Sequence, residues 1–464
     1  MIRALPPYPA YKDSGVPWLG KVPVHWEVMP VKRALRPQSC GTAAIKNTAA
    51  ATPLDGYAPA FSASGQDVWL PRASHCGSAL VLSAVGARCG KTFRADGEWG
   101  VVANTHILWP RAGQNRDYWW YVTNNEAWWD KAGAAQPFVR VSATLERSWV
   151  IPPLPEQTAI VRFLDYVERR IRRFIRAKQK LIKLLEEYRQ ALIHQAVTGK
   201  IDVRTGKPYP AYKDSGVPWL GHVPQHWEVV KLKFISKRMQ NGSTPPTDVG
   251  EYYADQGIPW YGPSSLLEEI LIGLPVRFVT ERAILDNKVR VIQPPALVIS
   301  VIGNVGKSAL MLEQGATNQQ LTCCELDQKI CNPVFVVNQF RMAEHYLVAS
   351  ASSTTIAILD SEVLRNMPLA IPPLPEQTAI VEYLDAQTAK LDAAIAAARR
   401  EIELLREYRE RLIADVVTGK VDVRQVAAQL PEEPAEEEAG TEEEEPVADE
   451  LATVDSQEES NGEE

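Results

Sequence analysis

The chain has 464 residues, of which 45% are hydrophobic, so it can form folded cores in two or more domains. No run approaches the roughly 20 apolar residues of a membrane span, and the N-terminal residues lack the apolar stretch of a signal peptide, which favours a cytoplasmic protein. The six cysteines form no CxxC pair. This argues against a zinc site or a disulfide framework and predicts buried free thiols.

The net charge of −7 is unevenly distributed. Residues 431–464 contain 16 acidic residues and no Lys or Arg, so residues 1–430 carry 50 basic against 41 acidic side chains, a net charge of +9. We therefore expect a basic folded body followed by a disordered acidic tail, residues 425–464 in the domain division. The tail would either keep the protein soluble or imitate nucleic acid and suppress nonspecific binding.

The chain begins with a block that recurs. Tyr8–Gly20 reads YPAYKDSGVPWLG, and the same thirteen residues return at Tyr209–Gly221, each followed by VPxHWEV. We expect the tyrosine, histidine and tryptophans of these blocks to be structural and to seat each following domain on the ends of long helices.

Two less similar regions, residues 29–150 and 230–370, follow the blocks. Ala79–Phe93 and Ala296–Leu310 each place an apolar strand before a glycine-rich turn that ends in Gly-Lys. Val101–Pro110 and Gly315–Leu326 each place polar residues before a second strand. We expect two related domains of mixed α/β fold.

The aromatic segment Tyr118–Asp130, YWWYVTNNEAWWD, has two readings. Its rings could stack on bases, or they could pack one face of a helix against the domain core. Helical spacing of Trp119, Tyr121 or Val122 and Trp128 or Trp129 favours packing.

A second shared segment follows each domain. Residues 151–204 and 371–424 both begin IPPLPEQTAIV and reach Val-Thr-Gly-Lys at a constant offset of 220. Steps of three and four predict one long helix of roughly 40 residues, about 60 Å, in each copy. The expected seam of the first helix is Leu164, Val167, Ile171, Phe174, Leu181, Leu185, Tyr188 and Leu192, interrupted by Lys178. Ala394 and Ala398 thin the seam of the second helix and would let a partner helix approach, with Gly199 and Gly419 ending the two helices.

These features together resemble the specificity subunit of type I restriction-modification systems. The duplicated PPLPEQ helices and the YKDSGVxWLGxVPxHW blocks carry the resemblance, which covers residues 8 to about 424. It implies target recognition domains at 1–150 and 205–370, each of α/β (α+β) class and each reading half of a split DNA site. Residues 151–204 and 371–424 would be conserved helical spacers that pair as an antiparallel coiled coil in a pseudo-twofold circular arrangement.

The resemblance also implies partners and cofactors. Modification subunits, two in number, would bring S-adenosylmethionine and methylate adenine, and restriction subunits would bring ATP- and Mg-dependent translocation and cleavage. The chain itself would be a non-catalytic subunit that binds double-stranded DNA and no cofactor.

Candidate DNA contacts are polar side chains on loops, because reading the major groove requires hydrogen-bonding groups that can enter it. Lys91 and Lys307 are better placed for phosphates, as flexible charges after glycines. Each candidate could instead be a turn or surface residue. The first domain offers Ser62, Ser64, Gln66, Arg88, Lys91, Asn104, Thr105 and His106, and the second offers Ser264, Ser265, Asn304, Lys307, Asn318, Gln319 and Gln320.

Two other classes of function remain to be weighed. An enzyme with a degenerate nucleotide-binding loop is disfavoured, because Gly303–Ser308 has two residues between its glycines where a phosphate-binding loop has four. Asn332–Phe335 lacks the second proline of the methyltransferase NPP[YF] motif, and Asp327–Lys329 matches the D-x-K of nucleases only by a common chance pattern. A coiled-coil scaffold that does not bind DNA would leave the basic, divergent domains without a role.

The order of the repeat makes one further prediction. In the middle of the chain the first helix runs through VTGK into YPAYKDSGVPWLG, whereas the second helix ends at VTGKVDVR and its expected continuation lies at the N-terminus. We therefore expect Tyr8–Gly20 to dock on the end of the second helix.

Overall fold

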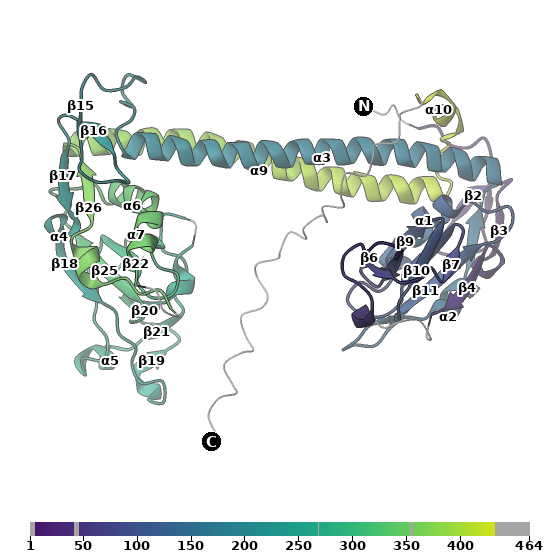
Figure 1. The fold of residues 1–464 in the computed structure, drawn as a ribbon, viewed down its shortest axis with the longest axis horizontal. Helices are drawn as coiled ribbons and strands as arrows, with labels where there is room; N and C mark the ends of the chain where they lie inside the picture. Colours follow the sequence, from purple (N-terminus) through teal and green to yellow (C-terminus); the bar gives the residue numbers. More distant parts are fainter. Residues whose placement is uncertain (1–4, 41–45, 268, 353–355, 432–464) are drawn as a thin grey trace. The chain divides into compact units, whose positions relative to one another are not determined.

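The computed structural model describes residues 5–40, 46–267, 269–352 and 356–431 (Figure 1). Its contacts divide the described chain into two compact units. The first combines residues from Met1–Arg172 with residues from Glu407–Glu464, and the second spans Arg173–Arg406. The expected disorder of residues 432–464 lies outside the described residues. No described helix is long and apolar enough to cross a membrane.

The domain of the first unit contains two four-stranded sheets. One has the order β4-β11-β8-β9 and the other β6-β5-β10-β7, in which β5 and β10 are parallel. Phe61, Val81, Trp99 and Ile107 form a buried core cluster from both sheets. The strands are β4 (Leu35–Ser39), β5 (Ala58–Ser62), β6 (Gly65–Leu70), β7 (His75–Cys76), β8 (Ala79–Ser83), β9 (Thr92–Ala95), β10 (Glu98–Val101) and β11 (Thr105–Pro110).

The domain of the second unit repeats this plan. Its sheets have the orders β18-β25-β22-β23 and β19-β21-β20-β24, and β20 and β24 are again parallel. The expected kinship of the two regions and their mixed α/β class are confirmed. The strands are β18 (Ser236–Asn241), β19 (Tyr253–Ala254), β20 (Ile258–Tyr261), β21 (Arg277–Val279), β22 (Ala296–Ser300), β23 (Ser308–Met311), β24 (Ala316–Thr317) and β25 (Leu321–Leu326).

Smaller elements complete each unit. The N-terminal blocks form short hairpins, and a two-stranded ribbon leads into each long helix. In the first unit these are β1 (Tyr11–Asp13), β2 (Lys21–Pro23), β3 (Glu27–Pro30), β12 (Lys131–Ala132), β13 (Phe138–Val139), β14 (Ser148–Ile151), α1 (Arg116–Thr123) and α2 (Val141–Glu146). In the second they are β15 (Tyr212–Asp214), β16 (His222–Pro224), β17 (Glu228–Lys231), β26 (Pro368–Ile371), α4 (Leu232–Ile235), α5 (Glu281–Leu285), α6 (Pro333–Met342), α7 (Glu344–Ser350) and α8 (Ser361–Arg365).

Helix α1 settles the two readings of the aromatic segment. Tyr118, Trp119 and Tyr121 are buried on its inner face, and Trp129 beyond its end is buried as well. Packing against the core is therefore confirmed. In the second unit Asn332 caps α6 by accepting hydrogen bonds from the backbone N–H groups of Val334 and Phe335, which accounts for the Asn-Pro-Val-Phe sequence as a helix start.

The two long helices are α3 (Leu154–Val197) and α9 (Leu374–Val417), each of 44 residues. Gly199 and Gly419 follow their ends with φ of +71° and +76°, values that glycine adopts without strain. The helices pack together within each unit (Figure 1).

Ion pairs show that the helices run antiparallel. In the second unit Lys178 Nζ lies 2.7 Å from Glu401 Oε2, and Arg189 Nε lies 3.2 Å from Asp392 Oδ1. Residue numbers therefore rise along α3 as they fall along α9. The first unit contributes the pair of Arg409 Nη1 and Glu168 Oε1, 3.6 Å apart. The predicted antiparallel pairing is confirmed.

The predicted seam is partly wrong. Phe174, Leu181 and Tyr188 are 54%, 41% and 58% exposed, and Ala394 is exposed as well. The contact face instead follows Ile171, Ile175, Lys178, Ile182, Leu185, Arg189 and Leu192. Lys178 and Arg189 hold core positions of the heptad because each has an acidic partner on α9. The apolar residues misled the sequence interpretation because they form a second heptad stripe that faces outward.

The N-terminal block docks on the end of α9, as the repeat order predicts. The N–H of Asp422 donates to the carbonyl of Pro6 at 2.7 Å, and the Tyr11 hydroxyl donates to the carbonyl of Lys420 at 3.0 Å. The second unit makes the same bonds within a continuous chain: Asp202 N–H to Lys207 O at 2.8 Å, and Tyr212 hydroxyl to Lys200 O at 3.2 Å.

The acidic tail begins later than expected. Residues 425–429, assigned to the disordered tail from the sequence, belong to helix α10 (Arg424–Gln429). Ala427 is buried there, and Arg162 of α3 donates to the carbonyl of Leu430 at 2.6 Å. These residues fold because RQVAAQL contains no acidic residue and can pack; the acidic run starts at Glu432.

The corrected seam predicts the outcome of two neighbouring substitutions. Ile175→Ala removes a side chain that is 4% exposed and should lower the free energy of unfolding by about 2–4 kcal/mol. Phe174→Ala removes a larger but mostly exposed side chain and should cost less than about 1 kcal/mol. Urea unfolding of the purified variants measures both losses. If Phe174→Ala is the more destabilising of the two, the seam predicted from the sequence is correct and the corrected one is wrong.

Docking of the N-terminal block predicts that the chain tolerates circular permutation. A Thr-Gly-Lys-Pro linker, copied from Thr205–Pro208, would join Arg424 to Tyr8. The chain would be opened between Thr205 and Pro208, so that the new termini lie in this turn. We expect circular dichroism and a thermal midpoint close to those of a chain truncated after Arg424. A permutant that aggregates while the truncated control stays soluble would contradict the docking.

Candidate nucleic-acid interface

The two lysine-bearing turns are equivalent. In the first domain the turn from β8 to β9 is closed by Gly90 N–H to Ser83 O at 2.8 Å and by Ser83 N–H to Lys91 O at 2.9 Å. In the second domain Gly306 N–H donates to Ser300 O at 3.0 Å, and Ser300 N–H donates to Lys307 O at 2.9 Å. Both lysine side chains are exposed. The same backbone geometry therefore presents one cation in each domain.

A polar turn lies beside each lysine turn. This turn follows one strand of the parallel pair, and a backbone hydrogen bond ties its start to the other strand. Val102 N–H donates to Phe61 O in the first domain, and Asn318 N–H donates to Tyr261 O in the second, each at 3.0 Å. A carbonyl of the same turn also accepts a hydrogen bond from the residue after β8 or β22. Asn104 O accepts from Ala84 N–H in the first domain, and Gln320 O accepts from Val301 N–H in the second, each at 2.9 Å. Asn104 and Gln320 thus occupy equivalent positions within the two segments that the sequence matches.

The lysine turn and the polar turn together form one edge of each domain. The first domain brings most of its candidates to this edge. Ser64, Gln66, Arg88, Lys91 and Asn104 are exposed, and Arg88 Nη1 donates to the carbonyl of Ser64 at 3.4 Å. The tip of the β5–β6 hairpin therefore lies against the lysine turn.

Three candidates of the first domain are less available. The hydroxyl of Ser62 is buried and accepts from the N–H of Ser64 at 3.0 Å, while Thr105 is buried and donates to Val102 O at 2.7 Å. His106 is half-buried, and burial lowers the pKa of its imidazole, which favours the neutral ring. The first two hydroxyls stabilise the turns from within.

The second domain shows a similar division. Ser264, Asn304, Lys307 and Gln319 are exposed. Ser265 is buried and donates to Leu274 O at 2.8 Å. Asn318 is 8% exposed and holds Gln320 through two hydrogen bonds.

The sequence interpretation missed two residues of this edge. The Thr244 hydroxyl donates to Gln319 Oε1, and Asn241 Oδ1 accepts from the Thr322 hydroxyl at 2.8 Å. Gly242 lies between them against the carbonyls of Thr317 and Asn318, where a Cβ would collide. The polar run around this glycine, QNGST, was the available signal.

A buried carboxylate seats each domain on the helices. Glu376, in the first turn of α9, accepts from the Tyr209 hydroxyl at 2.6 Å and from Trp227 Nε1 at 3.0 Å, and it lies 2.9 Å from His226 Nε2. Burial would raise the pKa of Glu376, but these hydrogen bonds lower it overall. Arg204, beyond the end of α3, lies 3.9 Å from the same carboxylate.

The first unit repeats this arrangement around Glu156, which bonds to the Tyr8 hydroxyl and lies 2.8 Å from His25 Nε2. Burial and the bond to Glu156 raise the pKa of Tyr8. The next residue, Gln157, accepts from the N–H of Asn115, the cap of α1, at 2.8 Å. Gln377 does the same for Asn332 at 2.7 Å. The repeated Pro-Glu-Gln thus connects helix, block and domain.

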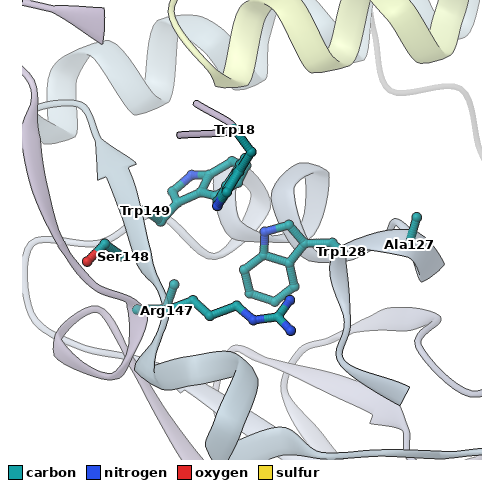
Figure 2. Close-up of a pocket in the computed structure, with 7 residues that line it drawn as sticks. Trp18, Ala127, Trp128, Arg147, Ser148 and Trp149 are labelled. Atoms are coloured by element: carbon teal, nitrogen blue, oxygen red, sulfur yellow. The ribbon is translucent and has the colours of Figure 1, made fainter. Parts of the chain in front are cut away.

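The first domain also has an aromatic cavity of about 190 Å³ (Figure 2). Trp18, Trp128, Trp149 and Arg147 line it, and Trp18 is 58% exposed. The rings of Trp18 and Trp149 lie 5.3 Å apart. Met367 and Leu369 stand at the places of Arg147 and Trp149 in the second unit, so this aromatic lining is not repeated there.

Within the described residues no group of three or more His, Cys, Asp or Glu is placed to hold a metal ion. The cysteines are free, and five of them are buried, as predicted; Cys76 is the exposed exception. Burial raises the pKa of Cys323 and Cys331 to about 12, so these thiols stay protonated.

Comparison with known proteins gives a consistent result. Residues 224–404 match the family model described as the type I restriction modification DNA specificity domain. The specificity subunit of the type I restriction enzyme EcoDI of Escherichia coli is 20% identical over 87% of this chain and 90% of its own length. The EcoBI specificity subunit of the same species is 27% identical over 28% of this chain.

Several matches are partial. The chain matches 27% of the EcoBI subunit and 57% of the EcoR124I/EcoR124II specificity subunit, less than two thirds of either. Two solved structures share the fold over 86% of this chain at 16% identity. One concerns complex assembly and conformational transition of the type I R-M system, with a TM-score of 0.64. The other is the HsdS subunit from Thermoanaerobacter tengcongensis, with a TM-score of 0.50.

Residues 224–404 therefore define the class of this part of the chain, a type I restriction modification DNA specificity domain. The chain as a whole is similar to HsdS specificity subunits, as the block and helix motifs indicate.

The Glu376 cluster predicts a pH-dependent stability. Glu376→Gln keeps the shape but removes the charge that three donors face, and it should lower the free energy of unfolding by about 1–3 kcal/mol at pH 7. Because the folded-state pKa is lowered, this contribution is present above the unfolded value of about 4.3 and is lost as pH falls through the folded pKa.

The measurement is urea unfolding of wild type and variant at several pH values. The exposed Glu382→Gln on the same helix is the matched control and should behave like wild type. A difference between wild type and the Glu376 variant that stays constant as the pH falls from 7 through the unfolded value of about 4.3 and well below it would contradict the assigned role.

Proposed function

We propose that this chain is the DNA-recognition subunit of a type I restriction-modification complex and that it binds a bipartite double-stranded site. Target recognition domains 1–150 and 205–370 each read one half-site, and the helical segments 151–204 and 371–424 hold them. The chain is not itself an enzyme. It acts in the cytoplasm, where its DNA lies.

The observation that carries this proposal is the repeated edge. Two related domains, which share the order of one four-stranded sheet and a parallel strand pair in the other, present an exposed lysine and a neighbouring polar turn at equivalent positions, yet the side chains on the polar turns differ. A shared cation suits the phosphate backbone, which is the same at every site. Different polar groups suit two different sequences.

The outward stripe of α3 supports a docking role for the helices. Phe174, Leu181, Leu184 and Tyr188 repeat at heptad spacing and are all more than 40% exposed. A stripe of this kind fits helices of another subunit. We assign it to modification subunits, one for each helical segment and so two in all; restriction subunits complete the assembly. S-adenosylmethionine, ATP and Mg belong to these partners.

The decisive experiment co-expresses the chain with the modification subunit from the same genome in a host without other adenine methylation. We expect methylated adenines to define a split consensus with a fixed spacer. The purified chain with S-adenosylmethionine alone should not methylate DNA. A continuous consensus, or methylation by the chain alone, would reject the proposal.

The paired lysines predict a salt effect. If each neutralises one phosphate, Lys91→Ala or Lys307→Ala should lower the slope of log K against log salt by about 1 and weaken binding to all sequences equally. Lys390→Ala, on an exposed position of α9, is the control and should leave the slope unchanged. Fluorescence anisotropy with duplexes that contain the consensus measures the slopes; unaltered slopes in both variants would exclude phosphate contacts by these lysines.

A further inference from the structure

The equivalent positions of Asn104 and Gln320 differ in which hydrogen-bonding groups they can offer. The side chain of Asn104 is exposed and makes no hydrogen bond to any described residue. Both its donor and its acceptor are therefore available. Gln320 is only partly exposed, and its amide is held by Asn318.

The orientation of the Gln320 amide follows from the chemistry of its contacts. The backbone N–H of Gln320 is a donor, so the Asn318 atom 3.1 Å away must be the oxygen Oδ1. The other amide atom of Asn318 is then Nδ2, a donor, and the Gln320 atom 2.9 Å from it must be Oε1. Exchange of oxygen and nitrogen in either amide would place two donors together. The assignment is thus fixed without reference to hydrogen positions.

Burial of Asn318 sets which edge of the Gln320 amide faces outward. Because Asn318 is 8% exposed, the oxygen bonded to it faces the domain. Gln320 Nε2 has no hydrogen-bond partner among the described residues and keeps two N–H donors for a ligand. In the first domain Val102 replaces Asn318 at the equivalent turn position, so no side chain orients Asn104 in this way.

Resting on the proposed function, we propose that Gln320 reads a guanine in the half-site of the second domain and that Asn318 is the positioning residue for this choice. Guanine presents two acceptors in the major groove, N7 and O6, which match an edge that offers only donors. A free glutamine or asparagine amide pairs instead with adenine, through N7 and the N6 amino group. Asn104 keeps that second option in the first half-site.

The test uses the full chain in complex with its modification subunits and a library of duplexes randomised across both half-sites. Bound duplexes are sequenced to obtain the base preference at every position. Wild type should select a guanine in the second half-site. Gln320→Ala should reduce that preference about tenfold or more, the discrimination expected from one good base contact, and leave the first half-site unchanged.

Asn318→Asp separates positioning from mere support of the fold. A carboxylate at this place still accepts from the Gln320 N–H but cannot donate, so the Gln320 amide must turn and present its oxygen outward. The preference at the same position should then move from guanine to adenine or cytosine, which carry an amino donor in the major groove. Asn104→Ala is the reciprocal control, because it should alter the first half-site only.

The outcomes are distinct. If wild type selects a split site but Gln320→Ala keeps every preference of the second half-site, the guanine assignment is wrong while the proposed function stands. If Asn318→Asp weakens binding without changing the preferred base, Asn318 has a structural role only and the positioning is refuted. If wild type selects no sequence at all, the proposed function fails and the inference with it.

Discussion

The buried carboxylate at the start of each long helix is the interaction on which the architecture depends. Glu376 joins three parts of the chain: its own helix, the tyrosine and tryptophan of the repeated block, and, through Arg204, the residues beyond the other helix. A buried carboxylate without these donors would be unstable, and the donors would be unsatisfied without it. The adjacent glutamine fixes the cap of a domain helix. Helix ends, block and domain are thereby held in one orientation, so that anything presented at the domain edge is presented in a defined place.

Because this frame is duplicated, the two domains keep the same backbone supports and can differ in the side chains that their turns expose. The order of the β4-β11-β8-β9 sheet, the presence of a parallel pair in the other sheet and the backbone hydrogen bonds of both turns are the same in the two units. The side chains carried by these turns are not, as Asn104 and Gln320 illustrate. The aromatic cavity beside Trp18 makes the same point, because an identical block meets Trp149 in one unit and Leu369 in the other. The frame constrains the backbone and leaves the exposed groups free to change.

The sequence predicted the parts of the structure that depend on repetition. The block, the helices and the matching strand-turn segments could be found because two copies can be compared within one chain. The helix seam could not be read correctly, since α3 has two apolar heptad stripes and the buried one contains Lys178 and Arg189. Charged residues at core positions are recognisable only when their partners on α9 are known. Among the candidate site residues, exposure separated Ser64 from Ser62 and Ser264 from Ser265. Polar residues in a turn look alike in sequence whether they face solvent or bond to the next carbonyl.

One pair of equivalent hydrogen bonds differs greatly in how far along the chain its partners lie. The tyrosine of the block bonds to the lysine after the helix across 12 residues in the second unit and across 409 residues in the first. Taken alone, closing the larger loop costs about 3 kcal/mol more chain entropy, five doublings at roughly 0.6 kcal/mol each. During synthesis the partner of the first block is also made last. The second unit can therefore form this bond while the ribosome is still extending the chain, whereas the bond between Tyr11 and Lys420 in the first unit must wait for the end of α9. The order in which these two bonds can form is thus opposite to the order of the blocks in the sequence.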